Sequence, residues 1–308
     1  MEPKEGVTIG LETLLEVGLA VRNVNFTPHQ RANSILMGRH GSKLRGRGMD
    51  FLELKNYVAG DDTRHIDWRA SRRTGKAQVR VFHEERERSV YLLLSQQSHL
   101  FFGTQGCFKS VQAAKIASLV IHAILKQGDR IGAVLFDDTD TSFFKASKNK
   151  NSALSIVDAI ASLNQTLVKH HTASNTEMFN KALDVVMPHI KHDDLLILIG
   201  DGAGLDVKAQ EKITLLSQHN DIIGVIVYDP LERTLPQEES LHFSWQNETL
   251  TLNGKDATTQ ALFQQGYEAK RQKYLQLSLL HRIPLFEIAT DKDPLLQLQQ
   301  QLGVLYAR

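Results

Sequence analysis

The sequence predicts an α/β protein with a doubly wound, mostly parallel, Rossmann-like sheet and an N-terminal extension packed on it. Short apolar runs alternate with segments of helical periodicity from residue 89 onward, which is typical of parallel sheets. The run LLILI at residues 195–199 has no polar alternation, as expected for a central strand covered on both faces. Before residue 89 the composition is highly charged. We therefore expect two parts, an extension over residues 1–88 and an α/β domain over residues 89–308.

The expected helices share leucine, isoleucine, valine or alanine at intervals of three and four residues, which gives one apolar face. Several end at turn residues, as at Gly128 after the second helix. The expected helical ranges are 11–24, 108–125, 153–163, 176–187, 207–218, 257–281 and 294–302.

The expected strands are short apolar or β-branched runs bounded by turn residues. Two of them form hairpins: residues 142–145 pair with the strand before them, and residues 241–245 pair with 249–252. The expected strand ranges are 77–82, 90–94, 130–136, 142–145, 195–199, 222–228, 241–245, 249–252 and 284–288.

Charge and cysteine content limit the class of protein. The 36 basic and 35 acidic residues give a net charge of +1, so a basic nucleic-acid-binding surface is not a property of the whole chain. Cys107 is the only cysteine, which excludes an intrachain disulfide and favours a reducing compartment. Residues 1–10 lack the pattern of a signal peptide, and no apolar run approaches the ~18 residues of a membrane span. We expect a cytoplasmic protein.

The charged segment at residues 51–80 still carries aromatic and aliphatic anchors, unlike a disordered tail. Its centre, Gly60-Asp61-Asp62-Thr63-Arg64-His65-Ile66-Asp67-Trp68-Arg69, alternates acids and bases. We interpret it as a network of charge-assisted hydrogen bonds around a buried Trp68. A turn at residues 74–76 follows, and the segment is expected to clamp onto the larger domain.

The glycine-rich basic stretch at residues 38–47 has two interpretations. It is either a phosphate- or nucleic-acid-binding loop, or a surface loop whose arginines pair with the acids that follow. No strand, glycine-rich turn and helix with a GK[ST] ending frames it, so we favour the second interpretation.

Other clusters suggest chemistry less strongly. Asp61, Asp62 and Asp67, with Glu53, are a possible Mg²⁺ site for phosphoester hydrolysis, but arginines lie among them and favour salt-bridged structure. The histidines at 170, 171, 189 and 192 lack the spacing of a zinc site, and Cys107 has no evident histidine partner. We therefore expect no catalytic residue, no metal and no cofactor.

Several motifs in order resemble the signature of the DUF58 family (domain of unknown function 58). They are Gly48 to Phe51, Tyr57, Gly60-Asp61-Asp62, Arg64, Ile66-Asp67-Trp68, Glu84-Glu85, LLLSQQSHLFFGT from Leu92, Lys109-Ser110 and Gly128-Asp129-Arg130. The resemblance implies a von Willebrand factor type A-like second half. It also implies a partner, a MoxR-type AAA+ ATPase, with which such proteins act in the assembly or maturation of protein complexes.

Type A domains often carry a metal-ion-dependent adhesion site, built from Asp-x-Ser-x-Ser, a threonine and a second aspartate. The resemblance places Ser95, Gln97 and His99 in the first motif, Thr176 or Thr172 as the threonine, and Asp201 as the aspartate. Mg²⁺ prefers hard oxygen ligands, but the leading carboxylate is missing and His99 offers nitrogen. We expect a degenerate site in a non-enzymatic protein-binding module. Its apolar contacts would come from Leu100, Phe101 or Phe102, whichever face outward.

Overall fold

The structure is a computed structural model that describes residues 6–21, 49–84, 88–168, 173–245 and 248–306. The chain divides into two compact units, one of Met1–Pro28 with Arg88–Arg308 and the other of His29–Glu87. Helix α1 (Leu11–Leu19) packs on helix α3 (Lys109–Gln127) and so belongs to the larger unit. The expected extension of residues 1–88 is therefore divided between the two units.

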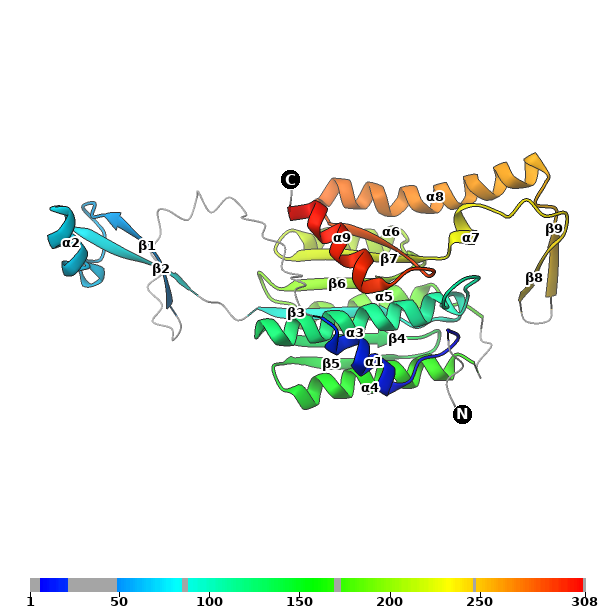
Figure 1. The fold of residues 1–308 in the computed structure, drawn as a ribbon, viewed down its shortest axis with the longest axis horizontal. Helices are drawn as coiled ribbons and strands as arrows, with labels where there is room; N and C mark the ends of the chain where they lie inside the picture. The colour runs from blue at the N-terminus through cyan, green and yellow to red at the C-terminus, as the bar shows by residue number, and fades with distance from the viewer. Residues whose placement is uncertain (1–5, 22–48, 85–87, 169–172, 246–247, 307–308) are drawn as a thin grey trace. The chain divides into compact units, whose positions relative to one another are not determined.

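A six-stranded sheet forms the centre of the larger unit, in the order β10-β7-β6-β3-β4-β5 (Figure 1). Every neighbouring pair is parallel except β4 and β5, which form the expected antiparallel hairpin. The mostly parallel sheet is thus confirmed, with β6 and β3 at its centre. The strands are β3 (Ser89–Ser95), β4 (Arg130–Phe136), β5 (Thr141–Ser147), β6 (Leu195–Gly200), β7 (Asp221–Tyr228) and β10 (Leu285–Ala289).

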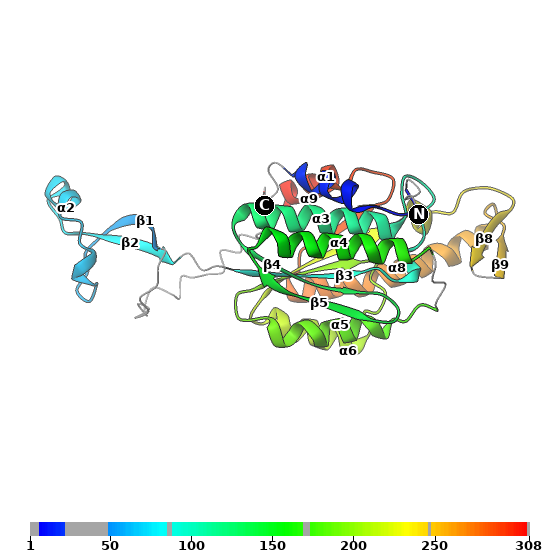
Figure 2. The same ribbon diagram turned by 90° about the horizontal axis from the view of Figure 1, so that it is seen from below.

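Helices cover both faces of this sheet, as Figure 2 shows nearly edge-on. Helices α1, α3, α4 and α9 lie over one face, and α5 and α6 lie over the other. The remaining bounds are α4 (Lys150–Thr166), α5 (Glu177–Val186), α6 (Val207–Ser217), α7 (Pro230–Arg233), α8 (Ala257–His281) and α9 (Pro294–Tyr306), with short 3₁₀ turns η3 (Ser98–Leu100) and η4 (Met187–His189).

The side chains of strand β3 are apolar on both faces of the sheet, so helices must pack on both faces. Val90, Leu92 and Leu94 contribute to the core under α3, while Tyr91 and Leu93 contribute to the core under α5 and α6. Successive side chains of a strand point to opposite faces, so a continuous apolar run supplies two cores at once. Burial of both faces also fixes the register, because a slip of one residue would exchange the two sets.

A second hairpin and a long helix complete the larger unit. Strands β8 (Leu241–Trp245) and β9 (Glu248–Leu252) form a separate antiparallel hairpin, as the sequence predicts. Helix α8 follows with the expected bounds, and of its 25 residues, all of which the structure describes, only Tyr274 is buried. None of the helices in the described part of the chain is long and apolar enough to cross a membrane.

The smaller unit is built on a hairpin of β1 (Met49–Asn56) and β2 (Gln78–Glu84), joined by η2 (Thr63–His65) and helix α2 (Trp68–Thr74). Neither β1 nor α2 was expected. The expected turn after α2 is confirmed: Gly75 ends the helix with a φ of 71°, in the left-handed region that favours glycine.

The prediction that Trp68 is buried is wrong. Trp68 begins α2 and is 70% exposed, whereas Ala70 on the opposite side of the helix is buried. The expected acid–base pairs do form, but they hold loop and helix termini and do not surround a tryptophan.

Candidate functional site at the carboxyl edge of the sheet

Four connections meet beyond the carboxyl ends of the central strands, where ligands of open α/β sheets bind. They are the loop after β3, the turn after β4, the residues before α5 and the loop after β6. Hydrogen bonds join the first three, since Gln97 binds both Asp138 and Asn175. His99 and Asp201 bring the fourth into contact with the first.

Asp201 is the centre of this site, and two lysine ammonium groups and the His99 ring surround its carboxylate. Its Oδ2 lies 3.1 Å from Lys109 Nζ and 3.1 Å from Lys270 Nζ. Its Oδ1 lies 3.1 Å from His99 Nε2 and accepts a 3.0 Å hydrogen bond from the backbone N–H of Ala203. The Asp201 and Lys109 side chains are 4% and 3% exposed, so this is a buried ion pair.

A second carboxylate completes the surroundings of Lys109. Glu232 Oε1 lies 2.9 Å from Lys109 Nζ, so the ammonium has two acidic partners. Glu232 is held in turn by a capping box at α7, where its other oxygen accepts a hydrogen bond from the Asp229 backbone N–H. The lysine therefore links the loop after β6 to the connection after β7.

The pKa directions follow from this arrangement. Burial by itself would raise the pKa of the Asp201 carboxyl, but Lys109, His99 and Lys270 outweigh it and hold the pKa well below its ordinary value. Burial would likewise lower the pKa of the Lys109 ammonium, but Asp201 and Glu232 raise the pKa above its ordinary value. Both groups are charged at neutral pH, and the pair is an internal salt bridge.

The loop after β6 takes its shape from glycines. Gly202 and Gly204 have φ values of 81° and 83°, in the left-handed region. A Cβ on Gly204 would lie 2.7 Å from the Thr176 carbonyl oxygen, so only glycine allows this approach. The backbone of Thr176 thus lies beside the loop, but its side chain is exposed and does not cap α5.

The other two residues of the expected adhesion motif are bound within the loops. Ser95 Oγ donates to Gln97 Oε1 at 3.2 Å. Gln97 Nε2 donates to Asp138 Oδ1 at 3.0 Å and to the Asn175 carbonyl at 2.7 Å. Asp138 also accepts from the backbone N–H groups of Ser98 and Asn175. These hydrogen bonds hold the three loops together. The side-chain oxygen of Gln97 accepts the bond from Ser95, so it is already engaged within the loop.

The donor set does not fit a magnesium site. Mg²⁺ needs several oxygens in octahedral order, yet Ser95 replaces a carboxylate, His99 offers nitrogen, and both Asp201 oxygens already bind donors. The cationic partners beside Asp201 Oδ2 are the ammonium groups of Lys109 and Lys270. Among the residues that the structure describes, no cluster of three or more His, Cys, Asp or Glu has metal-binding geometry.

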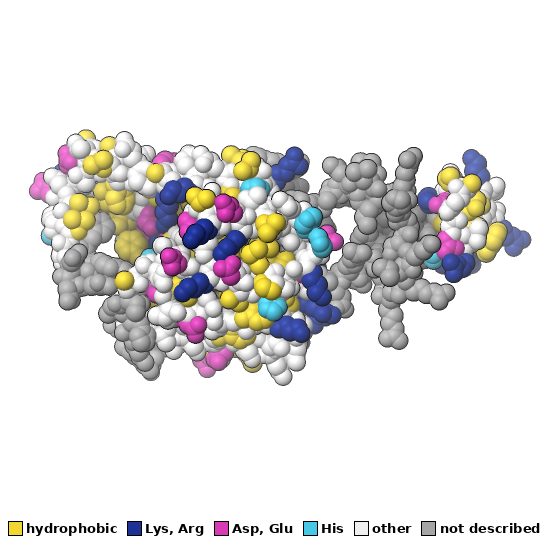
Figure 3. Space-filling view, turned by 180° about the vertical axis from the view of Figure 1, so that it is seen from behind, with side chains coloured by type: hydrophobic (Ala, Val, Ile, Leu, Met, Phe, Trp, Pro, Cys, Tyr) yellow, Lys and Arg dark blue, Asp and Glu magenta, His cyan; other side chains and the backbone are white. Residues whose placement is uncertain are grey.

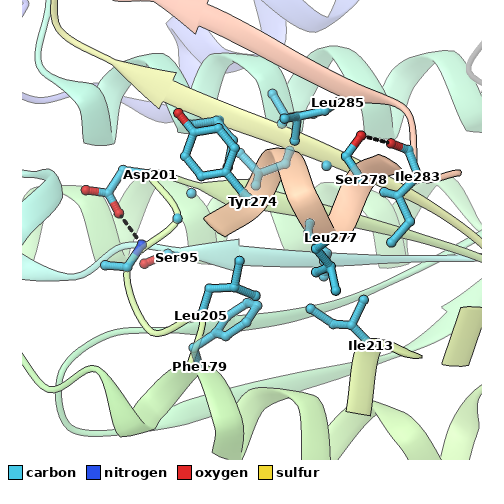
Figure 4. A pocket seen from close by; sticks show the side chains of 18 of the residues that line it. Ser95, Phe179, Asp201, Leu205, Ile213, Tyr274, Leu277, Ser278, Ile283 and Leu285 are labelled. Carbon is cyan, nitrogen blue, oxygen red and sulfur yellow. Dashed lines mark hydrogen bonds between the residues drawn. The ribbon is translucent and has the colours of Figure 1, made fainter. Parts of the chain in front are cut away.

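A small apolar pocket lies directly behind this site, between the sheet and α8 (Figure 4). Its volume is about 70 Å³. Asp201 and Ser95 lie at one end, and Tyr274 and Leu277 of α8 line its side. The remaining lining is mainly aliphatic and aromatic, including Phe179, Leu205, Ile213, Ile283 and Leu285.

The apolar residues after His99 are only partly available to a partner. Leu100 is fully buried, so it packs inward. Phe101 packs edge-on against Phe108, with ring centroids 4.8 Å apart, and Phe102 lies below Lys109 Nζ at 5.9 Å. Both phenylalanines are half-buried, and Thr104 beyond them is exposed.

Comparison with known proteins identifies the family. The family described as "Protein of unknown function DUF58" matches residues 53–273, most of the chain. The chain belongs to the DUF58 family. Uncharacterised proteins of Mycobacterium bovis and Mycobacterium tuberculosis are 23% identical to it over 221 residues, which are 72% of this chain and 68% of theirs.

Solved structures with partial similarity were also found. BatB, a conserved hypothetical protein from Bacteroides thetaiotaomicron, is 11% identical with a TM-score of 0.43. An aerotolerance-related membrane protein from Bacteroides fragilis is 11% identical with a TM-score of 0.46. The similarity covers 72% of this DUF58 chain and 100% of each of the two structures.

Three aspartates of the DUF58 signature, Asp61, Asp62 and Asp67, each pair with a basic residue. Asp61 pairs with Lys55 at 2.7 Å, Asp62 pairs with Arg64 at 3.1 Å, and Asp67 pairs with Arg80 at 2.8 Å. Hydrogen bonds from these basic partners and from backbone N–H groups lower the pKa of each carboxyl. The structural interpretation of these residues is therefore better supported than chelation.

The remaining sequence candidates have ordinary surroundings where the structure describes them. His189 stacks on Phe143, and His192 packs against His219. Cys107 is buried, and burial raises the pKa of its thiol. The histidines at 170 and 171, Thr172, and the loop at residues 38–47 lie outside the described residues.

Sequence reasoning missed the residues that complete the candidate site. Lys109 belongs to the Lys109-Ser110 motif of the family signature, but no neighbouring residue in the sequence indicated that its side chain is buried. Asp138 and Asn175 occupy polar turns with no motif of their own, and Lys270 lies in a helix of even polarity. Only alignment of related sequences would have exposed such partners before a structure.

Proposed function

We propose that this DUF58 chain is a non-enzymatic protein-binding module with a type A-like domain whose carboxyl edge binds its partner without a metal ion. The observation that carries the proposal is the buried Lys109 ammonium, bound to Asp201, the residue that the resemblance assigns to the adhesion site. In an intact adhesion site the cation bridges to a carboxylate of the partner. Here Asp201 and Glu232 both bind the buried Lys109 ammonium and neutralise its charge. The edge therefore offers no cation for a carboxylate of the partner to bind.

The surface that covers the Lys109–Asp201 ion pair has the side-chain types of a protein interface. Its exposed side chains include the neutral polar Thr104, Gln105, Thr139, Ser174 and Thr176 and the acidic Asp140 and Glu177. The half-buried rings of Phe101 and Phe102 lie among the loops. Interfaces commonly combine a polar rim with aromatic anchors. The potential nucleophiles and bases of the site are committed to internal hydrogen bonds, which supports binding over catalysis.

The partner that we propose is a MoxR-type AAA+ ATPase, in the assembly or maturation of protein complexes. The chain is a member of the DUF58 family. The family resemblance implies an association with these ATPases, and this implication supports the proposed partner. The type A-like assignment is supported by the parallel sheet and by the position of Asp201 at its carboxyl edge.

Capture of a purified MoxR-type ATPase by the immobilised chain tests this function. We expect capture to persist in excess EDTA and to weaken in the Phe101→Ala and Phe102→Ala variants. Calorimetric titration with Mg²⁺ and Mn²⁺ should show no binding that Asp201→Ala removes. Release of the ATPase by EDTA, with recovery on adding Mg²⁺, would show that the site uses a metal after all. Failure to capture the ATPase under any condition would refute the partner.

A further inference from the structure

Helix α2 in the smaller unit presents one continuous exposed face, made of Trp68, Arg69, Arg72 and Arg73, which we call the Trp68 face. All four side chains are exposed, and Trp68 is 70% exposed, more than any other aromatic residue whose burial the structure describes. At 3.6 residues per turn these positions span one side of the helix, and the buried Ala70 lies on the other. Figure 3 shows basic and hydrophobic side chains together on the surface of this unit.

The helix is held to the hairpin by contacts that leave this face free. Asp67 caps its N-terminus by accepting from the backbone N–H groups of Arg69 and Ala70, and it also pairs with Arg80 of β2. Ser71 Oγ donates to the Asp67 carbonyl at 2.7 Å and accepts from the Gln78 backbone N–H at 2.8 Å. Every one of these bonds lies on the inner side or at the end of α2, so the outer face is presented in a fixed orientation.

The cations of the Trp68 face differ from three other cations of the same unit. Lys55, Arg64 and Arg80 each pair with an aspartate. Arg69, Arg72 and Arg73 form no ion pair with any residue that the structure describes in this unit. Three unpaired guanidinium groups beside an exposed indole form a surface that complements negative charge.

We propose that the Trp68 face binds an acidic segment of a partner protein. Guanidinium groups often bind carboxylates with two parallel hydrogen bonds, and arginine and tryptophan are enriched at interface hot spots. The indole supplies an apolar contact, and the arginines select glutamate or aspartate around it. This surface belongs to a different unit from the carboxyl edge of the sheet, and the inference does not rest on the function proposed for that edge.

An acidic protein segment fits better than a nucleic acid. Single strands are bound by successive aromatic platforms along a basic groove, whereas this face has one indole.

Fluorescence measurements on the whole chain test the proposal. The chain has two tryptophans, so a Trp245→Phe background leaves Trp68 as the only indole. The probe is a fluorescein-labelled peptide of repeating Glu-Glu-Leu, and an otherwise identical Gln-Gln-Leu peptide is its control. We expect the acidic peptide to bind at low salt and to change Trp68 emission, and the neutral peptide to bind at least about tenfold more weakly.

Matched variants locate the site. Arg72→Gln with Arg73→Gln should weaken anisotropy-detected binding by about tenfold or more, as should Trp68→Ala. Lys150→Gln with Lys181→Gln removes the same charge from exposed positions in the other unit and should leave binding unchanged. Circular dichroism melts show that each variant is folded, and Arg72→Lys with Arg73→Lys separates the loss of charge from the loss of the planar guanidinium group.

Three outcomes overturn the proposal. The first is equal binding of the acidic and neutral peptides, and the second is unchanged binding in the Trp68→Ala and double-arginine variants. The third is tighter binding of fluorescein-labelled oligothymidine than of the acidic peptide, with the same residues required, which would assign the face to single-stranded nucleic acid.

Discussion

Replacing Lys109 with methionine removes the internal cation of the carboxyl-edge site while keeping most of the side-chain volume. Lys109 Nζ lies 3.1 Å from Asp201 and 2.9 Å from Glu232, and its side chain is 3% exposed. Removal of one partner from a buried ion pair costs ~3–5 kcal/mol, because the remaining charge is left uncompensated. Lys270 and His99 still contact Asp201, so we expect a loss near the lower limit, ~3 kcal/mol.

Thermal and urea unfolding followed by circular dichroism measure this loss. For a unit of this size, ~3 kcal/mol corresponds to a fall in Tm of ~6–12 °C. The double variant Lys109→Met with Asp201→Asn removes both charges, so it should lose less than the sum of the two single losses, by ~1 kcal/mol or more. Lys150→Met, at an exposed position of α4, is the matched control and should melt like the parent.

Two results would refute this reasoning. A Lys109→Met variant that melts like the parent would show that the ammonium is not a structural cation. A variant that loses stability but regains it fully with Mg²⁺ would show that the surrounding oxygens form a competent metal site. Either result would also remove the main support for metal-free binding at this edge.

Three further predictions follow from the described contacts. Asp67→Ala removes the cap of α2 and the partner of Arg80, so hydrogen–deuterium exchange in residues 68–74 should accelerate, and unchanged exchange would contradict the capping role. The pKa values of the Asp201 and Glu287 carboxyls are lowered in the folded chain, so their stabilisation is present above about pH 4 and is lost as the pH falls through the folded-state values. Urea unfolding measured from neutral to acid pH should show this loss of stability, and the loss should be smaller in the Glu287→Gln variant. An equally steep fall of stability with pH in that variant would contradict the role of Glu287. The Cys107 thiol, buried and with a raised pKa, should react with DTNB (5,5′-dithiobis(2-nitrobenzoic acid)) far more slowly in the folded chain than in urea, and equal rates would contradict its burial.

The sequence alone determined most of the larger unit, because its signals are local. The apolar run at residues 195–199 predicts a strand buried on both faces, and β6 is such a strand. The bounds of α8 and the β8–β9 hairpin also match their expected ranges, since periodicity and turn residues specify them within a few positions. These features need no knowledge of what packs against them.

The tertiary structure decided which charged and aromatic side chains are buried. Lys109 and Asp201 are 92 positions apart and meet because β3 and β6 are neighbours in the sheet, which places their following loops side by side. Trp68 was expected inside and lies outside, because capping by Asp67 begins a helix there and turns Ala70 inward. The burial of a polar or amphipathic side chain depends on distant partners that offset its desolvation, and those partners are set by strand order and helix rotation.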